Sequence, residues 1–169
     1  MNETRLASLA AVAVVIHALE GMIPMPVPWM RLGLANIVTL VVLSLFGLGS
    51  ALMVTVVRVV VGSLIAGQLL GPGFFLALAG GTAATVGMGL LRKAAGGGLS
   101  LVGVSLAGAF LHNVVQLAVA GLVYTRHAGV FYLLPVLMGL ALPTGLVTGW
   151  LAERVVRRMK GENGEWVNR

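Results

Sequence analysis

The chain has 169 residues, of which 59% are hydrophobic and only 9% are charged, and its formal net charge is +6. A soluble domain has about 25% charged residues, so this composition excludes a soluble protein and predicts a multi-pass protein of the cytoplasmic membrane. The length suffices for about six spans of roughly 20 residues. The absence of cysteine also excludes disulfides and thiolate metal sites.

Apolar runs predict six membrane helices, at about residues 6–23, 34–46, 50–69, 74–91, 100–124 and 130–156. We therefore expect an all-α, six-transmembrane-helix bundle that forms a single domain over residues 1–160. Pro143 is expected to kink the sixth helix or divide it in two. Residues 161–169 lack periodicity and are expected to be a disordered cytoplasmic tail.

The segment from Glu20 to Asn36 interrupts the apolar pattern most strongly, because it carries prolines at alternate positions, namely Pro24, Pro26 and Pro28. Each proline removes a backbone donor and fixes φ, so a helix cannot continue through them. This segment is predicted to be a shaped loop between the first two helices.

The positive charges predict the orientation, because retained Lys and Arg residues mark the cytoplasmic side. With six spans, one side holds most of them, namely Arg5, Arg92, Lys93, Arg154, Arg157, Arg158, Lys160 and Arg169. The other side holds only Arg31 and Arg126. Both termini are therefore expected in the cytoplasm, and the cations need no nucleic acid to explain them.

Arg58 stands near the centre of the third predicted helix. A charge at that depth costs about 2.5 to 3.5 kcal/mol on the insertion scale and persists when it is paired or used. Thr55 and Gly62 share its face, so the guanidinium is expected to point into the bundle. It would hold an anionic or carbonyl group of a ligand, or pair structurally with Glu20 or loop carbonyls.

Glu20 and His17 lie one turn apart on the first helix. For Glu20 we consider a partnership with Arg31 or Arg58 and, as the alternative, direct contact with a ligand. His17 on its own is more typical of a hydrogen-bonded interior histidine than of a metal ligand. No second metal-binding side chain stands at suitable spacing, so no cofactor is expected.

The fifth helix carries a stripe of small and polar residues, formed by Ser105, Ala109, His112 and Gln116 with Asn113 beside it. Such side chains are costly in a membrane helix unless they are satisfied, and they usually mark a cavity or a pathway. We therefore expect His112, Asn113 and Gln116 to line a ligand site, with hydrogen bonds to neighbouring helices as the alternative. Asn36 would join them or would bond to loop backbone.

The first helix has two contrasting faces. Ala7, Ala11 and Ala18 form a stripe of small residues, which permits close helix packing. Ala13, His17 and Glu20 lie on the nearly opposite side.

Four segments taken together resemble the Gx transporter family, also labelled heptaprenyl diphosphate synthase component I. They are EGMIPMPVPWMRLGLANIVTL, VRVVVGSLIAG, ALAGGTAATVGM and GVSLAGAFLHNVVQLAVA, and the resemblance covers about Arg5 to Arg157. The family is grouped with the substrate-binding S components of energy-coupling factor (ECF) transporters. The resemblance implies a six-helix S-component fold in which outward loops close a pocket, and it makes Ala7 and Ala11 the docking site for a transmembrane coupling subunit.

The resemblance implies a membrane subunit that captures a small molecule, with an anionic or carbonyl-bearing group, for uptake driven by partner ATPases. Arg58, His112, Asn113 and Gln116 are the principal ligand candidates, with Asn36, Glu20 and Arg31 near the entrance. The alternative is a non-catalytic membrane partner in isoprenoid or quinone biosynthesis, or in quinone-linked extracellular electron transfer. Catalysis is not expected, because the chain contains no aspartate and prenyl diphosphate synthases hold magnesium through aspartate-rich motifs.

Overall fold

The computed structural model describes residues 2–23, 33–96 and 98–161, and the regular secondary structure of these residues is entirely helical, without a strand. The α-helices are α1 (Asn2–Met22), α2 (Ala35–Phe46), α3 (Leu48–Ile65), α4 (Pro72–Ala94), α5 (Leu101–Val119) and α6 (Leu134–Gly161). A π-helical turn, η1 (Ala120–Thr125), and a 3-10 helix, η2 (Ala128–Leu133), connect the last two. The proline-rich loop, Arg31 and the expected tail after Gly161 lie outside the described residues.

Five of these segments are long and apolar enough to cross a membrane: α1, α3, α4, α5 with η1, and α6 with η2. This confirms the prediction of a helical bundle suited to a membrane. Helix α2 has 12 residues, which give a length of about 18 Å against a hydrocarbon thickness of about 30 Å. Helix α2 is therefore too short to cross the bilayer alone.

Local sequence explains where several helices begin and end. Gly47 has a φ of 85° between α2 and α3, a conformation that favours glycine. Pro72 occupies the first turn of α4, where its missing N–H costs nothing. The hydroxyl of Ser100 accepts a hydrogen bond from the N–H of Gly103 and caps α5.

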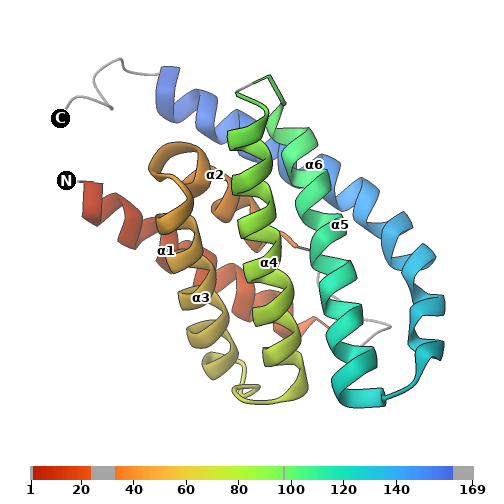
Figure 1. Ribbon diagram of the computed structural model, residues 1–169. Coiled ribbons are helices and arrows are strands. Elements are labelled where there is room, and N and C mark those ends of the chain that lie inside the picture. The colour runs from red at the N-terminus through yellow and green to blue at the C-terminus, as the bar shows by residue number, and fades with distance from the viewer. Residues whose placement is uncertain (1, 24–32, 97, 162–169) are drawn as a thin grey trace.

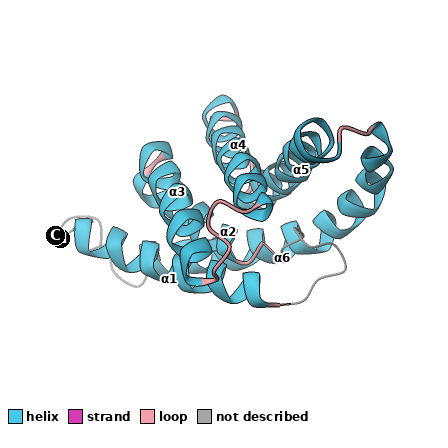
Figure 2. Ribbon diagram, turned by 90° about the horizontal axis from the view of Figure 1, so that it is seen from below, coloured by secondary structure: helices cyan, strands magenta, loops and turns pink. Residues whose placement is uncertain are grey.

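The helices pack in a ring in the order α1, α3, α4, α5, α6 and α2. Figure 1 shows them running alternately up and down, with the start of α1, the α2–α3 turn, the α4–α5 connection and the end of α6 toward one end. Figure 2, seen from the opposite end, shows α2 between α1 and α6. The main apolar core surrounds α2 and includes Leu40, Val41, Val54, Val104 and Ala152.

Helix α6 is continuous from Leu134 to Gly161, and Pro143 lies inside it. The proline therefore does not divide the helix. Figure 1 shows instead that α6 curves as it crosses the bundle. The close approach of α5 and α6 depends on Gly149, where an added Cβ would lie 2.6 Å from the Cα of Val102.

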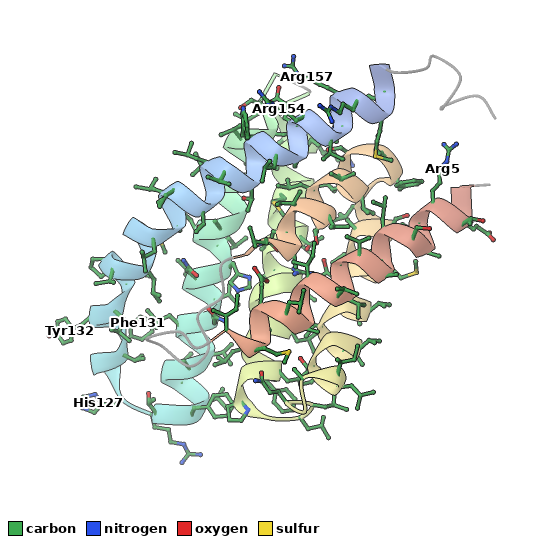
Figure 3. The ribbon with its side chains drawn as sticks, turned by 180° about the vertical axis from the view of Figure 1, so that it is seen from behind. Arg5, His127, Phe131, Tyr132, Arg154 and Arg157 are labelled. Atoms are coloured by element: carbon green, nitrogen blue, oxygen red, sulfur yellow. The ribbon has the colours of Figure 1, made fainter. Side chains whose placement is uncertain are left out.

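Charged and aromatic side chains mark the two ends of the bundle. Figure 3 shows Arg5, Arg154 and Arg157 at the end that holds the two chain termini, and His127 and Tyr132 at the other end. The guanidinium of Arg154 lies 4.0 Å above the centre of the Trp150 ring, an arrangement that suits a membrane boundary.

Candidate functional site

A cavity of about 120 Å³ lies inside the bundle, and all six helices contribute to its lining. It lies next to the first turn of α2, because Asn36 is in its wall. Helix α2 thus borders the cavity through its first turn, and it packs against α1, α3 and α6. The polar lining residues are His17, Glu20, Asn36, Arg58, Ser105, His112, Asn113, Thr144 and Thr148.

Arg58 and Asn36 form the best-defined contact in the polar wall. The Nη2 atom of Arg58 donates to Oδ1 of Asn36 over 2.8 Å. Arg58 is 4% exposed, and an added Cβ on Gly81 of α4 would lie 3.8 Å from its Nη2. The guanidinium therefore passes α4 at van der Waals distance on its way to α2.

Glu20 connects the end of α1 to the start of α2. Its Oε1 atom accepts a hydrogen bond from the backbone N–H of Leu34 over 2.6 Å, and the side chain is 4% exposed. A carboxylate beside the N-terminus of a helix is favoured by the partial positive charge there. The sequence did not indicate this contact, because nothing in it shows that the first turn of α2 lies beside Glu20. Its expected pairing with Arg31 or Arg58 stays a prediction.

Two histidines of the cavity each pack against a glycine. An added Cβ on Gly62 of α3 would come within 2.7 Å of Cδ2 of His17, and one on Gly80 of α4 would come within 3.1 Å of Cε1 of His112. A methyl group at Gly62 would therefore displace the imidazole of His17, and one at Gly80 would press closely on that of His112. The imidazoles come from opposite parts of the ring, α1 and α5, and line the same cavity.

Hydrogen bonds between α5 and α6 satisfy several of the remaining polar groups. Nδ2 of Asn113 donates to the carbonyl of Leu137 over 3.0 Å. The hydroxyls of Ser105 and Thr148 lie 2.8 Å apart, and Thr148 also donates to the carbonyl of Gly145. The contacts of Asn113 with Leu137 and of Ser105 with Thr148 join α5 to α6. The side-chain oxygen of Asn113 is a group that can accept a hydrogen bond.

The structure brings together five of the seven ligand residues that the sequence suggested: Glu20, Asn36, Arg58, His112 and Asn113. Gln116 is 3% exposed and is not in the cavity lining, while Arg31 lies outside the described residues. Whether any of them binds a ligand stays a prediction. Ala7 and Ala11 are exposed on α1, as a docking role requires.

The sequence did not place Thr144, Thr148 or His17 among the ligand candidates, yet all three line the cavity. His17 shares the face of Glu20, a signal that would have justified including it. Thr144 and Thr148 stand one turn apart on α6, but a threonine in a membrane helix usually bonds to its own backbone and gives no functional signal. Among the described residues, no cluster of three or more His, Cys, Asp and Glu side chains is arranged to hold a metal ion.

The sequence matches the family described as heptaprenyl diphosphate synthase component I over residues 9–155. The chain belongs to this family. The match begins within α1 and extends to the last turns of α6, so all the lining residues of the cavity lie within it. Comparisons with curated proteins and with solved structures found no match.

The name of the component I family describes part of a synthase and implies a partner component in a complex. It does not make this chain the catalytic part. The lining of the cavity contains a guanidinium, a carboxylate, two imidazoles and the carboxamides of two asparagines. Such groups can bind and orient a polar molecule through hydrogen bonds.

Proposed function

We propose that this member of the component I family is a membrane substrate-binding subunit, of the S-component type, that captures a small molecule for uptake. A separate ATP-driven coupling module would supply the energy, because the chain has no phosphate-binding loop of its own. We also propose that the protein lies in the cytoplasmic membrane and that both of its termini are in the cytoplasm.

The observation that carries the proposal is the enclosure of Arg58, Glu20 and His112 in one cavity of an apolar bundle. Ionisable groups at such depth are costly and usually mark a binding site or a pathway. The lining combines them with apolar residues such as Met88 and Leu137, the composition typical of small-molecule sites. The guanidinium favours a ligand with an anionic or carbonyl group.

The test is to identify what the purified protein retains. Mass spectrometry of the released material should find one discrete small molecule, and Arg58→Ala should reduce its occupancy at least tenfold. Thr82→Ala is the matched control, because Thr82 lies outside the cavity lining and its hydroxyl donates to the carbonyl of Leu78. Full occupancy in Arg58→Ala would place the ligand elsewhere.

The second candidate is a non-catalytic membrane partner of an isoprenoid or quinone enzyme, or of an extracellular electron-transfer complex. The family description favours it, since component I implies a second component. Co-purification from native membranes distinguishes the two functions. A substrate-binding subunit should bring down a coupling subunit and its ATPases, whereas a synthase partner should bring down a prenyltransferase.

A further inference from the structure

The two sides of the cavity differ in chemistry. Helices α1, α2 and α3 supply His17, Glu20, Asn36 and Arg58. Helix α6 supplies apolar or small residues and two threonines, namely Leu137, Leu140, Ala141, Thr144, Gly145 and Thr148. Helix α5, which packs against α6, adds Ser105, His112 and Asn113. A ligand that fills this cavity therefore meets polar groups from α1, α2, α3 and α5 and mainly apolar groups from α6.

The threonines of α6 weaken this contrast only slightly, because each donates its hydroxyl hydrogen to a carbonyl of its own helix. Thr144 donates to the carbonyl of Leu140 over 2.9 Å, and Thr148 donates to Gly145 while it contacts Ser105. A hydroxyl that is satisfied by its own helix presents mainly its methyl group to a neighbour. The α6 side is thus suited to an apolar chain.

Leu140 marks where the cavity reaches the surface of the bundle. It lines the cavity and is 45% exposed, whereas its neighbours in the lining, Leu137 and Ala141, are each 3% exposed. Leu140 and Thr144 lie on the flank of α6 away from Gly145, which packs against α5. Helix α6 packs against α5 on one side and α2 on the other, so the exposed part of the lining lies on the α2 side of α6. Figure 3 shows α6 and α1 on the same face of the bundle.

The opening lies deep in the expected hydrocarbon layer. Between Arg126 and Glu153 the sequence has no Asp, Glu, Lys or Arg, and Leu140 is near the middle of that stretch. A side opening at this depth gives access to lipid chains and not to water.

We propose that the cavity binds an amphiphile that enters from the bilayer. Its polar end lies against Arg58 and Asn36, and its apolar chain passes Leu140 of α6 into the hydrocarbon. This inference rests on the proposed ligand-binding function and narrows it to a lipid-like substrate class.

The first test closes the opening. Leu140→Trp places a bulky side chain at the opening, and Val136→Trp is the matched control because Val136 is 60% exposed on α6 outside the lining. Material released from each protein is divided between chloroform and water and identified by mass spectrometry. We expect the retained molecule in the chloroform phase, with its occupancy reduced at least tenfold by Leu140→Trp and unchanged by Val136→Trp.

The outcomes separate this inference from the proposed function. The retained molecule could instead be found in the water phase, lost in Arg58→Ala and still bound in Leu140→Trp. This result would overturn the inference that the ligand is an amphiphile, but it would support the proposed binding function. A wild-type protein that retains no molecule in either phase would count against both. Thermal unfolding of each variant in detergent shows whether a loss of occupancy reflects loss of fold.

The second test measures whether the opening faces lipid chains and needs no ligand. The three tryptophans Trp29, Trp150 and Trp166 are replaced by phenylalanine, and Leu140→Trp then provides the only tryptophan. The protein is placed in phosphatidylcholine vesicles with bromine near the headgroup or near the chain end. We expect at least twofold stronger quenching by chain-end bromine, and equal or weaker quenching would overturn the inference.

Discussion

Arg58, near the middle of α3, donates through Nη2 to Oδ1 of Asn36 in the first turn of α2 over 2.8 Å. The contact fixes the guanidinium at the junction where Glu20 also holds the backbone of α2. Because a guanidinium has five N–H donors in a planar fork, the bond to Asn36 orients the group through one of them. Asn36 is thus a positioning residue for Arg58 as well as part of the cavity wall.

Replacing Arg58 by lysine should weaken ligand binding while keeping the positive charge. An ammonium cannot reproduce the planar fork, so we expect Arg58→Lys to lower ligand occupancy about tenfold, which corresponds to about 1.4 kcal/mol. Quantitative mass spectrometry of the retained molecule measures the change. Arg157→Lys is the control, because Arg157 is exposed and paired with Glu153. Equal ligand occupancy in the two variants would show that the planar guanidinium of Arg58 is not needed for binding.

A methyl group on Gly80 should disturb the cavity from the α4 side. The added Cβ would lie 3.1 Å from both Cε1 and the carbonyl oxygen of His112, so the imidazole has to move. We expect Gly80→Ala to lower ligand occupancy several-fold with a loss of stability of about 1 to 3 kcal/mol. Gly73→Ala is the control on the same helix, since an added Cβ there meets nothing within 4 Å. Wild-type occupancy in Gly80→Ala would contradict the placement of His112.

Thr55 should contribute to stability and not to binding. Its hydroxyl lies 2.9 Å from that of Thr85 and 3.5 Å from that of Thr39, which joins α3 to α4 and α2. Hydrogen bonds between membrane helices contribute about 0.6 kcal/mol on average and up to about 1.7. We expect Thr55→Val to lower the free energy of unfolding by about 1 kcal/mol with ligand occupancy unchanged.

Thermal or denaturant unfolding in detergent measures this effect. Thr55→Ser is the control because it keeps the hydroxyl, and it should restore most of the lost stability. If the valine variant loses ligand instead of stability, the threonine contact belongs to the binding site.

The sequence predicted the class of fold and most of the candidate site because both depend on local patterns. Apolar length identified the long helices, and the cost of charge in a membrane singled out Arg58. The single stripe predicted on α5 was less accurate. Ser105, His112 and Asn113 reach the cavity, whereas Gln116 is buried outside its lining, because only part of α5 borders the cavity.

The contacts that shape the cavity could not be predicted, since they join residues far apart in the chain. Nothing near Gly62 or Gly80 shows that each accommodates a histidine from another helix. The continuity of α6 through Pro143 is a similar case. A proline usually interrupts a soluble helix, but neighbouring helices and local adjustments can satisfy the freed carbonyl in a membrane bundle.

Substituting the alanine stripe of α1 should separate partner docking from ligand binding. Ala7 and Ala11 are exposed and outside the cavity lining, so leucine at both positions adds bulk to the surface without filling the cavity. If this stripe docks a coupling subunit through close helix packing, the double variant should lose at least tenfold of that subunit in co-purification. Ligand occupancy should remain at the wild-type level.

The matched control is Ser8→Leu, which adds similar bulk to another exposed position of the same helix, between the two alanines. Its wheel position lies about 60° to 100° from theirs at 100° per residue, so docking should survive. Equal loss of the coupling subunit in Ser8→Leu would indicate a nonspecific effect of bulk near the N-terminus. Unchanged co-purification in the double variant would instead show that α1 docks its partner through another surface, or docks none.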